Sequence, residues 1–97
     1  MEPHYLRMIS RMKKRGKKEW SVYILRCGDD SLYTGIAKDV QTRLAQHQKG
    51  QGAAYTRTHR PVTLIYQEIG MTRSRALIRE VAIKRLPRPR KEKLICA

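Results

Sequence analysis

The stretch WSVYILRCGDDSLYTG, residues 20–35, decides the fold, because it predicts two β-strands joined by a turn. The runs SVYILRC and LYTGIA are rich in β-branched and aromatic side chains, as strands usually are. The residues between these runs, GDDS, are turn formers. The chain therefore contains a β-hairpin with one tyrosine, Tyr23 or Tyr33, in each strand.

The length of the hairpin turn decides whether Tyr23 and Tyr33 lie together. Side chains alternate between the two faces of a strand, so a turn of even length places the two tyrosines on opposite faces of the sheet. A turn of odd length places them on one face. With a three-residue turn, Tyr23 lies opposite Gly35 and Leu25 lies opposite Tyr33, which makes the tyrosines diagonal neighbours. From this pattern alone they are either ordinary strand aromatics or a reactive pair, and both interpretations stay open.

The region after the hairpin predicts a helix and then a loop. Asp39 is a good N-cap, and bulky residues recur at helical spacing until Gly50 and Gly52 stop the run. This pattern predicts a helix over about residues 40–49. Residues 53–61, AAYTRTHRP, predict a loop with a short extended piece.

The last third of the chain predicts one strand and two helical segments. The run VTLIYQEI has the β-branched content of a third strand, which Gly70 ends. Thr72 can cap a second helix that extends to about Leu86, and prolines then separate it from RKEKLICA, a last short turn or helix. The predicted order β, β, α, β, α, α gives an α+β domain, in which helices pack on a small sheet.

The chain is strongly basic. Its 97 residues hold 22 Lys and Arg against 8 Asp and Glu, a net charge of +14, which favours nucleic acid as a partner. The length has room for one modest core, so we expect a basic flexible arm over residues 1–18 and a single domain over residues 19–97. An anionic membrane surface is the alternative partner, but neither basic segment continues into a strongly apolar helical face, and no run could span a bilayer.

The sequence does not indicate zinc binding, disulfide pairing or secretion. Cys27 and Cys96 have no partner at metal-ligand spacing, and the histidines do not complete a zinc pattern, so we expect two reduced thiols. The N-terminal residues lack the unbroken apolar stretch of a secretory signal. A cytoplasmic location is therefore expected.

Three polar residues in the predicted helices could carry chemistry. Arg43 and His47 lie one helical turn apart on the same face, and an arginine can grip a phosphate while a histidine can move a proton. Glu80 lies on the apolar stripe of an amphipathic helix, so its carboxylate needs a cation or a divalent metal as partner. In so basic a chain, this combination suggests metal-assisted phosphodiester hydrolysis. Structural roles, with His47 packed against the sheet and Glu80 paired with Arg79, Lys84 or another cation, stay open.

These residues together resemble the GIY-YIG nuclease superfamily. The runs SVY and YTG are similar to its two half-motifs, and Arg43, His47 and Glu80 stand where the family has its arginine, histidine and metal-binding glutamate. The resemblance runs from about residue 20 to the C-terminus. Segments such as LYTGIAKDVQTRLAQHQKGQGAAYTR resemble the small stand-alone bacterial members, the YhbQ-like (UPF0213) group.

The resemblance implies a sheet of three antiparallel strands flanked by helices, and hydrolysis of a DNA phosphodiester bond with one divalent ion, magnesium or manganese. By the same resemblance, Glu80 binds the metal and Arg43 holds the scissile phosphate. Tyr23 is favoured over Tyr33 as the general base, helped by neighbours such as His47. The pKa of that tyrosine would have to fall from about 10 for it to act near neutral pH. No small-molecule cofactor is expected.

The basic residues are expected to bind the phosphate backbone. The chain has no separate DNA-recognition domain, so we expect salt-sensitive binding and cutting that follows DNA structure or single strands instead of sequence, in DNA repair or processing. RNA is the alternative substrate, and a catalytically weak or inactive nucleic-acid-binding module is the alternative function. The side chains expected to contact nucleic acid are Lys38, Arg43, Lys49, Arg57, Arg60, Lys84 and Arg85.

Overall fold

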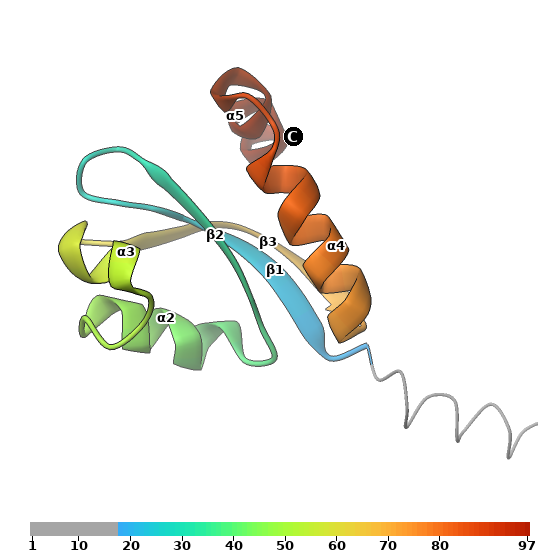
Figure 1. The fold of residues 1–97 in the computed structure, drawn as a ribbon, viewed down its shortest axis with the longest axis horizontal. Coiled ribbons are helices and arrows are strands. Elements are labelled where there is room, and N and C mark those ends of the chain that lie inside the picture. Colours follow the sequence, from blue (N-terminus) through green and yellow to red (C-terminus); the bar gives the residue numbers. More distant parts are fainter. Residues whose placement is uncertain (1–17) are drawn as a thin grey trace, which may run out of the picture.

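The computed structural model describes residues 18–97, which form a three-stranded antiparallel sheet with helices packed on it (Figure 1). The sheet order is β2-β1-β3, with β1 at Trp20–Arg26, β2 at Leu32–Ala37 and β3 at Thr63–Met71. The helices are α2 (Val40–Gln48), α3 (Ala54–Thr58), α4 (Arg73–Lys84) and α5 (Arg88–Cys96). The predicted α+β fold is confirmed, with α3 as an additional short helix. The predicted arm over residues 1–18 lies, apart from Lys18, outside the described residues.

The hairpin between β1 and β2 has a turn of odd length. The backbone NH of Cys27 donates to the carbonyl of Ser31 at 2.8 Å, which leaves three residues in the turn. In this register Tyr23 lies opposite Gly35. Tyr33 therefore occupies the same face of the sheet as Tyr23, as the three-residue alternative of the sequence analysis requires.

The two faces of the sheet carry two separate cores. We call them the α2 face and the α4 face, after the helices that cover them. The core of the α2 face contains Tyr23, Leu25, Cys27, Ala37, Val40 and Val62. The core of the α4 face contains Val22, Ile24, Ala76 and Ile83, with partly buried residues of α5 packed against it. Alternation along β1 produces this division.

The two predicted helix caps are present in the structure. The Asp39 carboxylate accepts a hydrogen bond from the backbone NH of Thr42, and the Thr72 hydroxyl accepts one from the backbone NH of Arg75. These bonds satisfy backbone donors that have no partner inside the first turn of a helix. The starts of α2 and α4 are therefore fixed by local sequence.

Two predictions, one about the segment of α3 and one about the end of β3, were wrong, and the end of α4 lies within two residues of its predicted place. Residues 54–58, predicted as part of a loop, form the single-turn helix α3. Gly70 does not end β3, because it adopts a φ of 78°, which glycine tolerates, and the strand continues to Met71. Helix α4 ends at Lys84, two residues before the predicted Leu86.

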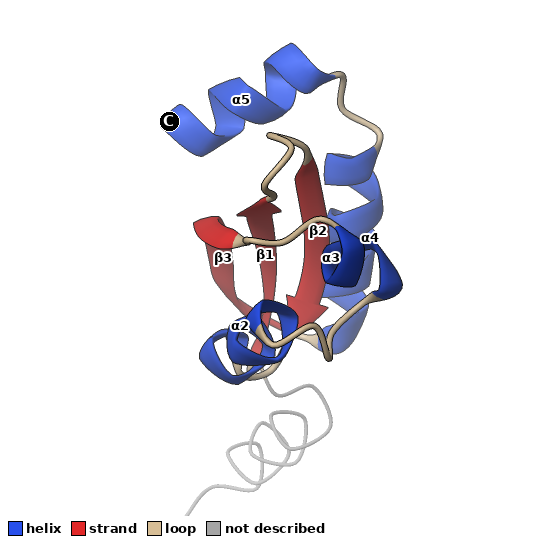
Figure 2. Ribbon diagram, turned by 90° about the vertical axis from the view of Figure 1, so that its left-hand side faces the viewer, coloured by secondary structure: helices blue, strands red, loops and turns tan. Residues whose placement is uncertain are grey.

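Helix α5 packs beside the hairpin turn, at the top of Figure 2. Arg26 at the end of β1 contacts Glu92 of α5 at 3.1 Å, and Arg88 of α5 donates to the carbonyl of Asp30 at 2.7 Å. These contacts tie the C-terminal helix to one end of the sheet. Within residues 18–97, no helix is long and apolar enough to cross a membrane.

Candidate active site

A chain of buried hydrogen bonds joins Tyr23 on β1 to His47 on α2 and Thr56 on α3. The Tyr23 hydroxyl lies 2.9 Å from His47 Nε2, and His47 Nδ1 lies 2.6 Å from Thr56 Oγ1. The Thr56 hydroxyl donates to the carbonyl of Ala53 at 3.0 Å, so its oxygen accepts from His47 Nδ1. We therefore assign the His47 tautomer whose Nε2 accepts a hydrogen bond from Tyr23.

Two glycines make room for this chain. A Cβ at Gly35, opposite Tyr23 in the sheet, would lie 2.5 Å from the Tyr23 hydroxyl oxygen. A Cβ at Gly52, beyond the end of α2, would overlap the ring of His47 at Nδ1. A side chain at either position would displace one of the two rings, so both glycines belong to the candidate site.

Tyr33 lies beside this pair on the same face. The centroid of its ring is 5.3 Å from that of His47 and 6.5 Å from that of Tyr23. Tyr23 is 1% exposed and His47 is fully buried, whereas Tyr33 is half-buried. The half-motif tyrosines and the histidine therefore form one cluster, in which Tyr33 lies closer to solvent than Tyr23.

The cluster is electrically neutral in the protein alone. Burial, with smaller contributions from Tyr33 and Glu80, raises the pKa of Tyr23 to about 12, although Arg43 acts in the opposite direction. Burial, aided by the positive charge of Arg43, lowers the pKa of His47. At neutral pH, Tyr23 keeps its proton and His47 stays uncharged. The fall in tyrosine pKa that the sequence analysis required is thus not found in the protein by itself.

Arg43 and Glu80 supply opposite charges near the tyrosines. Burial is the main cause of the raised pKa of Tyr33. The charge of Arg43 lowers this pKa, and the charge of Glu80 raises it. The Nη1 of Arg43 donates to Gln46 at 3.0 Å. The Glu80 side chain is 18% exposed and lies 3.6 Å from the ammonium group of Lys84. The structural pairing considered for Glu80 is therefore present, and it leaves the carboxylate within electrostatic range of both tyrosines.

The donor set fits a magnesium-like ion. Groups of three or more His, Cys, Asp or Glu side chains that could enclose a metal do not occur among residues 18–97. Mg²⁺, however, keeps several waters and is usually held by one or two carboxylates together with substrate phosphates. Glu80 is a single carboxylate of this kind, and it lies within electrostatic range of the two tyrosines, as Arg43 does. A zinc site, which needs three or four protein ligands, does not fit the described residues.

Only some of the basic residues that were expected to contact nucleic acid lie near the cluster of Tyr23, Tyr33 and His47. Lys49 caps the C-terminus of α2, Arg57 lies on α3, and the Arg60 guanidinium packs beside Gly50. These three cations surround the segment that holds His47 and Thr56. Arg43 and Lys84 also lie at the candidate site, Arg43 near the tyrosines and Lys84 paired with Glu80. Two lie elsewhere: Lys38 contacts Glu19 at 3.3 Å, and Arg85 caps α4 beside the exposed Leu77, Ile78 and Val81.

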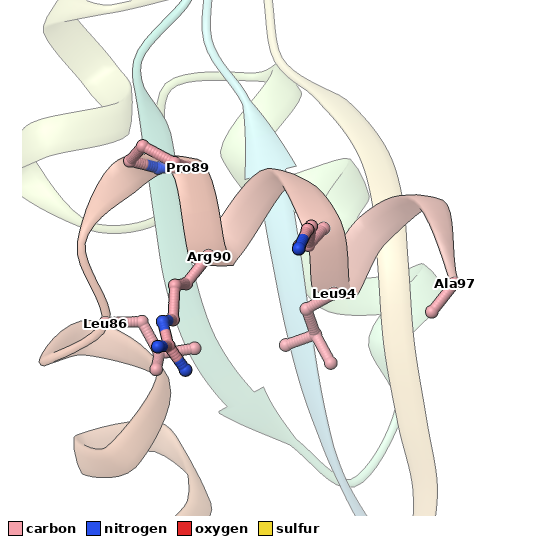
Figure 3. Close-up of a pocket in the computed structure, with 6 residues that line it drawn as sticks. Leu86, Pro89, Arg90, Leu94 and Ala97 are labelled. Carbon is pink, nitrogen blue, oxygen red and sulfur yellow. The ribbon is translucent and has the colours of Figure 1, made fainter.

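A pocket at α5 does not contain the candidate chemistry. Figure 3 shows it between the end of α4 and α5, with the residues that line it as sticks. The lining residues are Leu86, Pro89, Arg90, Lys93, Leu94 and Ala97. The tyrosines, the histidine and Glu80 are absent from this lining, so their cluster is separate from the pocket.

The sequence analysis missed Thr56 and Gly52. Thr56 was missed because its segment was predicted as a loop, and nothing in the sequence marks it as the partner of His47. Gly52 did leave a signal. Gly50, with a φ of 77°, suffices to end α2, so a second glycine two residues later needed another explanation. The close approach of the His47 ring supplies that explanation.

Comparison with known proteins identifies the class of this fold and site. A model of the GIY-YIG catalytic domain matches residues 19–93. A UPF0213 protein of Staphylococcus aureus is 55% identical over 74 residues, which cover 76% of this chain and 90% of that protein. The chain therefore belongs to the GIY-YIG family, a nuclease family, and to its small UPF0213 group.

Two solved structures are similar to this chain. The solution NMR structure of a UPF0213 protein from Bacillus halodurans matches with a TM-score of 0.52 and 39% identity, over 79% of this chain and 82% of that one. The solution NMR structure of a protein from E. faecalis matches with a TM-score of 0.53 and 38% identity, over 81% and 85% of the two chains.

Proposed function

We propose that this protein is a metal-dependent endonuclease that hydrolyses phosphodiester bonds of DNA. The observation that carries the proposal is the buried chain from Tyr23 through His47 to Thr56, set beside Arg43 and Glu80. Buried polar groups cost free energy unless they are bonded, and this chain occupies a core position that an apolar side chain would fill at lower cost. A chemical role accounts for that cost.

Glu80 holds one divalent ion, magnesium or manganese, in this proposal. The ion, when bound, would supply positive charge that offsets the negative charge of the phosphate in the transition state. Lys84, which pairs with Glu80 in the protein alone, would then be a cation available to the phosphate backbone. Glu80 would be the ligand that the protein supplies, since magnesium is usually held by one or two carboxylates together with waters and substrate phosphates.

Arg43 grips the scissile phosphate. A guanidinium presents five N–H donors in a planar fork, and Nη1 of Arg43 donates to Gln46. The remaining donors can bond phosphate oxygens in the transition state, where negative charge accumulates. The same positive charge lowers the pKa of Tyr33 and opposes the rise at Tyr23.

Tyr23 and His47 move the proton of the attacking water. The Tyr23 hydroxyl oxygen accepts a proton from the water while its own proton passes to His47 Nε2, and Thr56 holds His47 in the required tautomer. This transfer needs no free phenolate at rest, which a pKa of about 12 would forbid at neutral pH. Tyr33 borders the water, and Tyr23 is the general base.

The substrate is DNA, which the enzyme cuts according to strand structure and without preference for sequence. The reaction serves DNA repair or processing in the cytoplasm. The cations and aromatic rings of this domain support cutting without sequence preference, because cations contact phosphates without reading the base sequence. The alternative is a nucleic-acid-binding module with weak or no turnover, acting on DNA or RNA. The raised pKa of Tyr23 in the protein alone favours that alternative, so a cleavage assay has to decide between them.

The test is incubation of the purified chain with single-stranded, duplex and branched DNA and with RNA, in magnesium, in manganese and in a chelator. We expect metal-dependent cleavage of DNA that is lost in Glu80→Ala and in Tyr23→Phe. Tyr66→Phe is the matched control, because Tyr66 bonds Glu68 and packs against the α4 face. Cleavage that survives unchanged in Glu80→Ala and Tyr23→Phe would contradict the proposal.

A further inference from the structure

Tyr55 and His59 extend the aromatic cluster from the buried site toward solvent. The rings of Tyr55 and His59 are stacked, with centroids 3.9 Å apart and an interplanar angle of 4°. On its inner side Tyr55 stacks with Tyr33, at 6.2 Å and 19°, and Tyr33 contacts His47. Tyr55 is 40% exposed and the His59 side chain is 30% exposed. We call Tyr33, Tyr55 and His59 the aromatic row.

The outer rings of the aromatic row are held in place by the hairpin turn. The Tyr55 hydroxyl donates to Ser31 Oγ at 2.6 Å, and Ser31 Oγ donates to the Asp29 carboxylate at 2.5 Å. The same carboxylate lies 3.6 Å from His59 Nε2, and the backbone NH of Gly28 donates to the carbonyl of His59 at 2.8 Å. The rings are therefore ordered before any ligand arrives, which lowers the entropic cost of stacking on them.

Cations flank the aromatic row. Lys49, Arg57 and Arg60 are exposed, and no carboxylate of residues 18–97 forms an ion pair with them. Arg60 Nε donates to the backbone carbonyl of Arg57 at 3.3 Å, which holds the Arg60 side chain beside the end of α3. Aromatic faces beside unpaired cations are the arrangement that binds single-stranded nucleic acid, because rings stack on bases while cations follow the phosphates. A duplex hides the faces of its bases inside the helical stack.

We propose that His59, with the Tyr55 ring stacked behind it, forms a stacking platform for an unpaired base of single-stranded DNA, next to the phosphate held at Tyr23 and Arg43. The inference rests on the proposed function and makes it narrower, since it names the single strand as the substrate class. Tyr55 and His59 are then specificity-determining residues, distinct from the groups that move protons or bind metal. The competing explanation is a stack that only fastens α3 to the hairpin.

The test measures binding in a chelator, where no turnover occurs. Fluorescence anisotropy follows a labelled oligothymidylate, an abasic deoxyribose-phosphate strand of the same length, and a duplex. We expect the wild-type chain to bind the oligothymidylate about tenfold more tightly than the abasic strand. Tyr55→Phe keeps this ratio because the ring remains, whereas Tyr55→Leu removes it without changing affinity for the abasic strand.

The control is Arg57→Gln, which weakens binding of both single strands equally and reduces the salt dependence by about 0.7 in log–log slope. Equal wild-type affinity for the oligothymidylate and the abasic strand would overturn the proposal, as would a folded Tyr55→Leu that keeps the ratio. If Tyr55→Leu does not fold, the wild-type and Tyr55→Phe ratios decide. Loss of cleavage in the nuclease assay leaves these binding results untouched, so the two proposals fail separately.

Discussion

The two faces of the sheet differ in what they bury. On the α4 face Ile24 and Ile83 are fully buried in an apolar core. On the α2 face Tyr23, His47 and Thr56 are equally buried, yet each carries a polar group. No buried side-chain polar atom of residues 18–97 lacks a hydrogen-bond partner, so the polar face is fully bonded. The comparison teaches that β1 separates an apolar core from the buried polar chain of Tyr23, whereas the proposed metal ligand Glu80 comes from α4.

Removing Arg43 gives the largest expected effect, and it is confined to the α2 face. Arg43→Ala should lower the single-turnover cleavage rate by a hundredfold or more, because transition-state charge on the phosphate loses its fork of donors. Arg43→Lys keeps the charge but not the fork, and should fall between Ala and wild type. Thermal unfolding of both variants should stay close to that of wild type. Full activity in Arg43→Ala would contradict a catalytic role for the α2 face.

Truncating Ile83 tests the opposite face. Ile83→Ala should lower the free energy of unfolding by about 2 to 5 kcal/mol, because it leaves a cavity in the apolar core, and Ile83→Val by about 1 kcal/mol. Denaturant unfolding gives these values. Cleavage per folded molecule should remain within a few-fold of wild type in both variants. A stable Ile83→Ala protein without activity would mean that the two faces are not separable.

Gly35 tests whether packing on the α2 face controls the chemistry, because the space at Gly35 positions the Tyr23 ring. Gly35→Ala should cost about 1 to 3 kcal/mol and lower cleavage, since the new Cβ forces the Tyr23 ring away from His47. Gly70→Ala is the control: its Cβ meets open space, and its positive φ costs about 1 kcal/mol without touching the site. Wild-type cleavage by Gly35→Ala would show that the placement of Tyr23 is not important.

The smallest expected effect is a pH dependence of stability. The pKa of Tyr23 is raised from 10 to about 12 in the folded chain, so the folded state keeps a proton that the unfolded state loses above pH 10. This contribution is fully present below pH 10 and is lost as pH rises toward 12. At pH 11 it amounts to about 1 kcal/mol.

The measurement is denaturant unfolding at pH 9 and pH 11 for wild type and Tyr23→Phe. Wild type should lose about 1 kcal/mol more than Tyr23→Phe between these pH values. The other tyrosines are common to both proteins, so the difference isolates Tyr23. Identical losses would mean that burial does not hold the proton on Tyr23.

Local patterns were enough to predict the sheet, the helix caps and the division of β1 between two faces, because alternation and capping depend on near neighbours in the chain. They also offered the odd-length turn that joins Tyr23 to Tyr33, as one of two alternatives. The register of the structure selects it. The roles assigned to Tyr23, Arg43, His47 and Glu80 remain predictions.

Tertiary contacts explain what the sequence analysis missed. Helix α3 is five residues long, too short for intrinsic propensity to decide, and the bond from His47 to Thr56 ties it to α2. The direction of the Tyr23 pKa shift depends on burial, which follows only from the packing of α2 and the space left at Gly35. Such features require the assembled fold.

The most direct test of the division between faces is the cleavage rate of Tyr23→Phe, measured with its unfolding free energy. The substitution removes one hydroxyl and leaves Nε2 of buried His47 without its donor, which should cost only about 1 to 3 kcal/mol of stability. We predict that a folded Tyr23→Phe protein binds DNA like wild type and cleaves it at least a hundredfold more slowly. Wild-type cleavage by that protein would contradict the account.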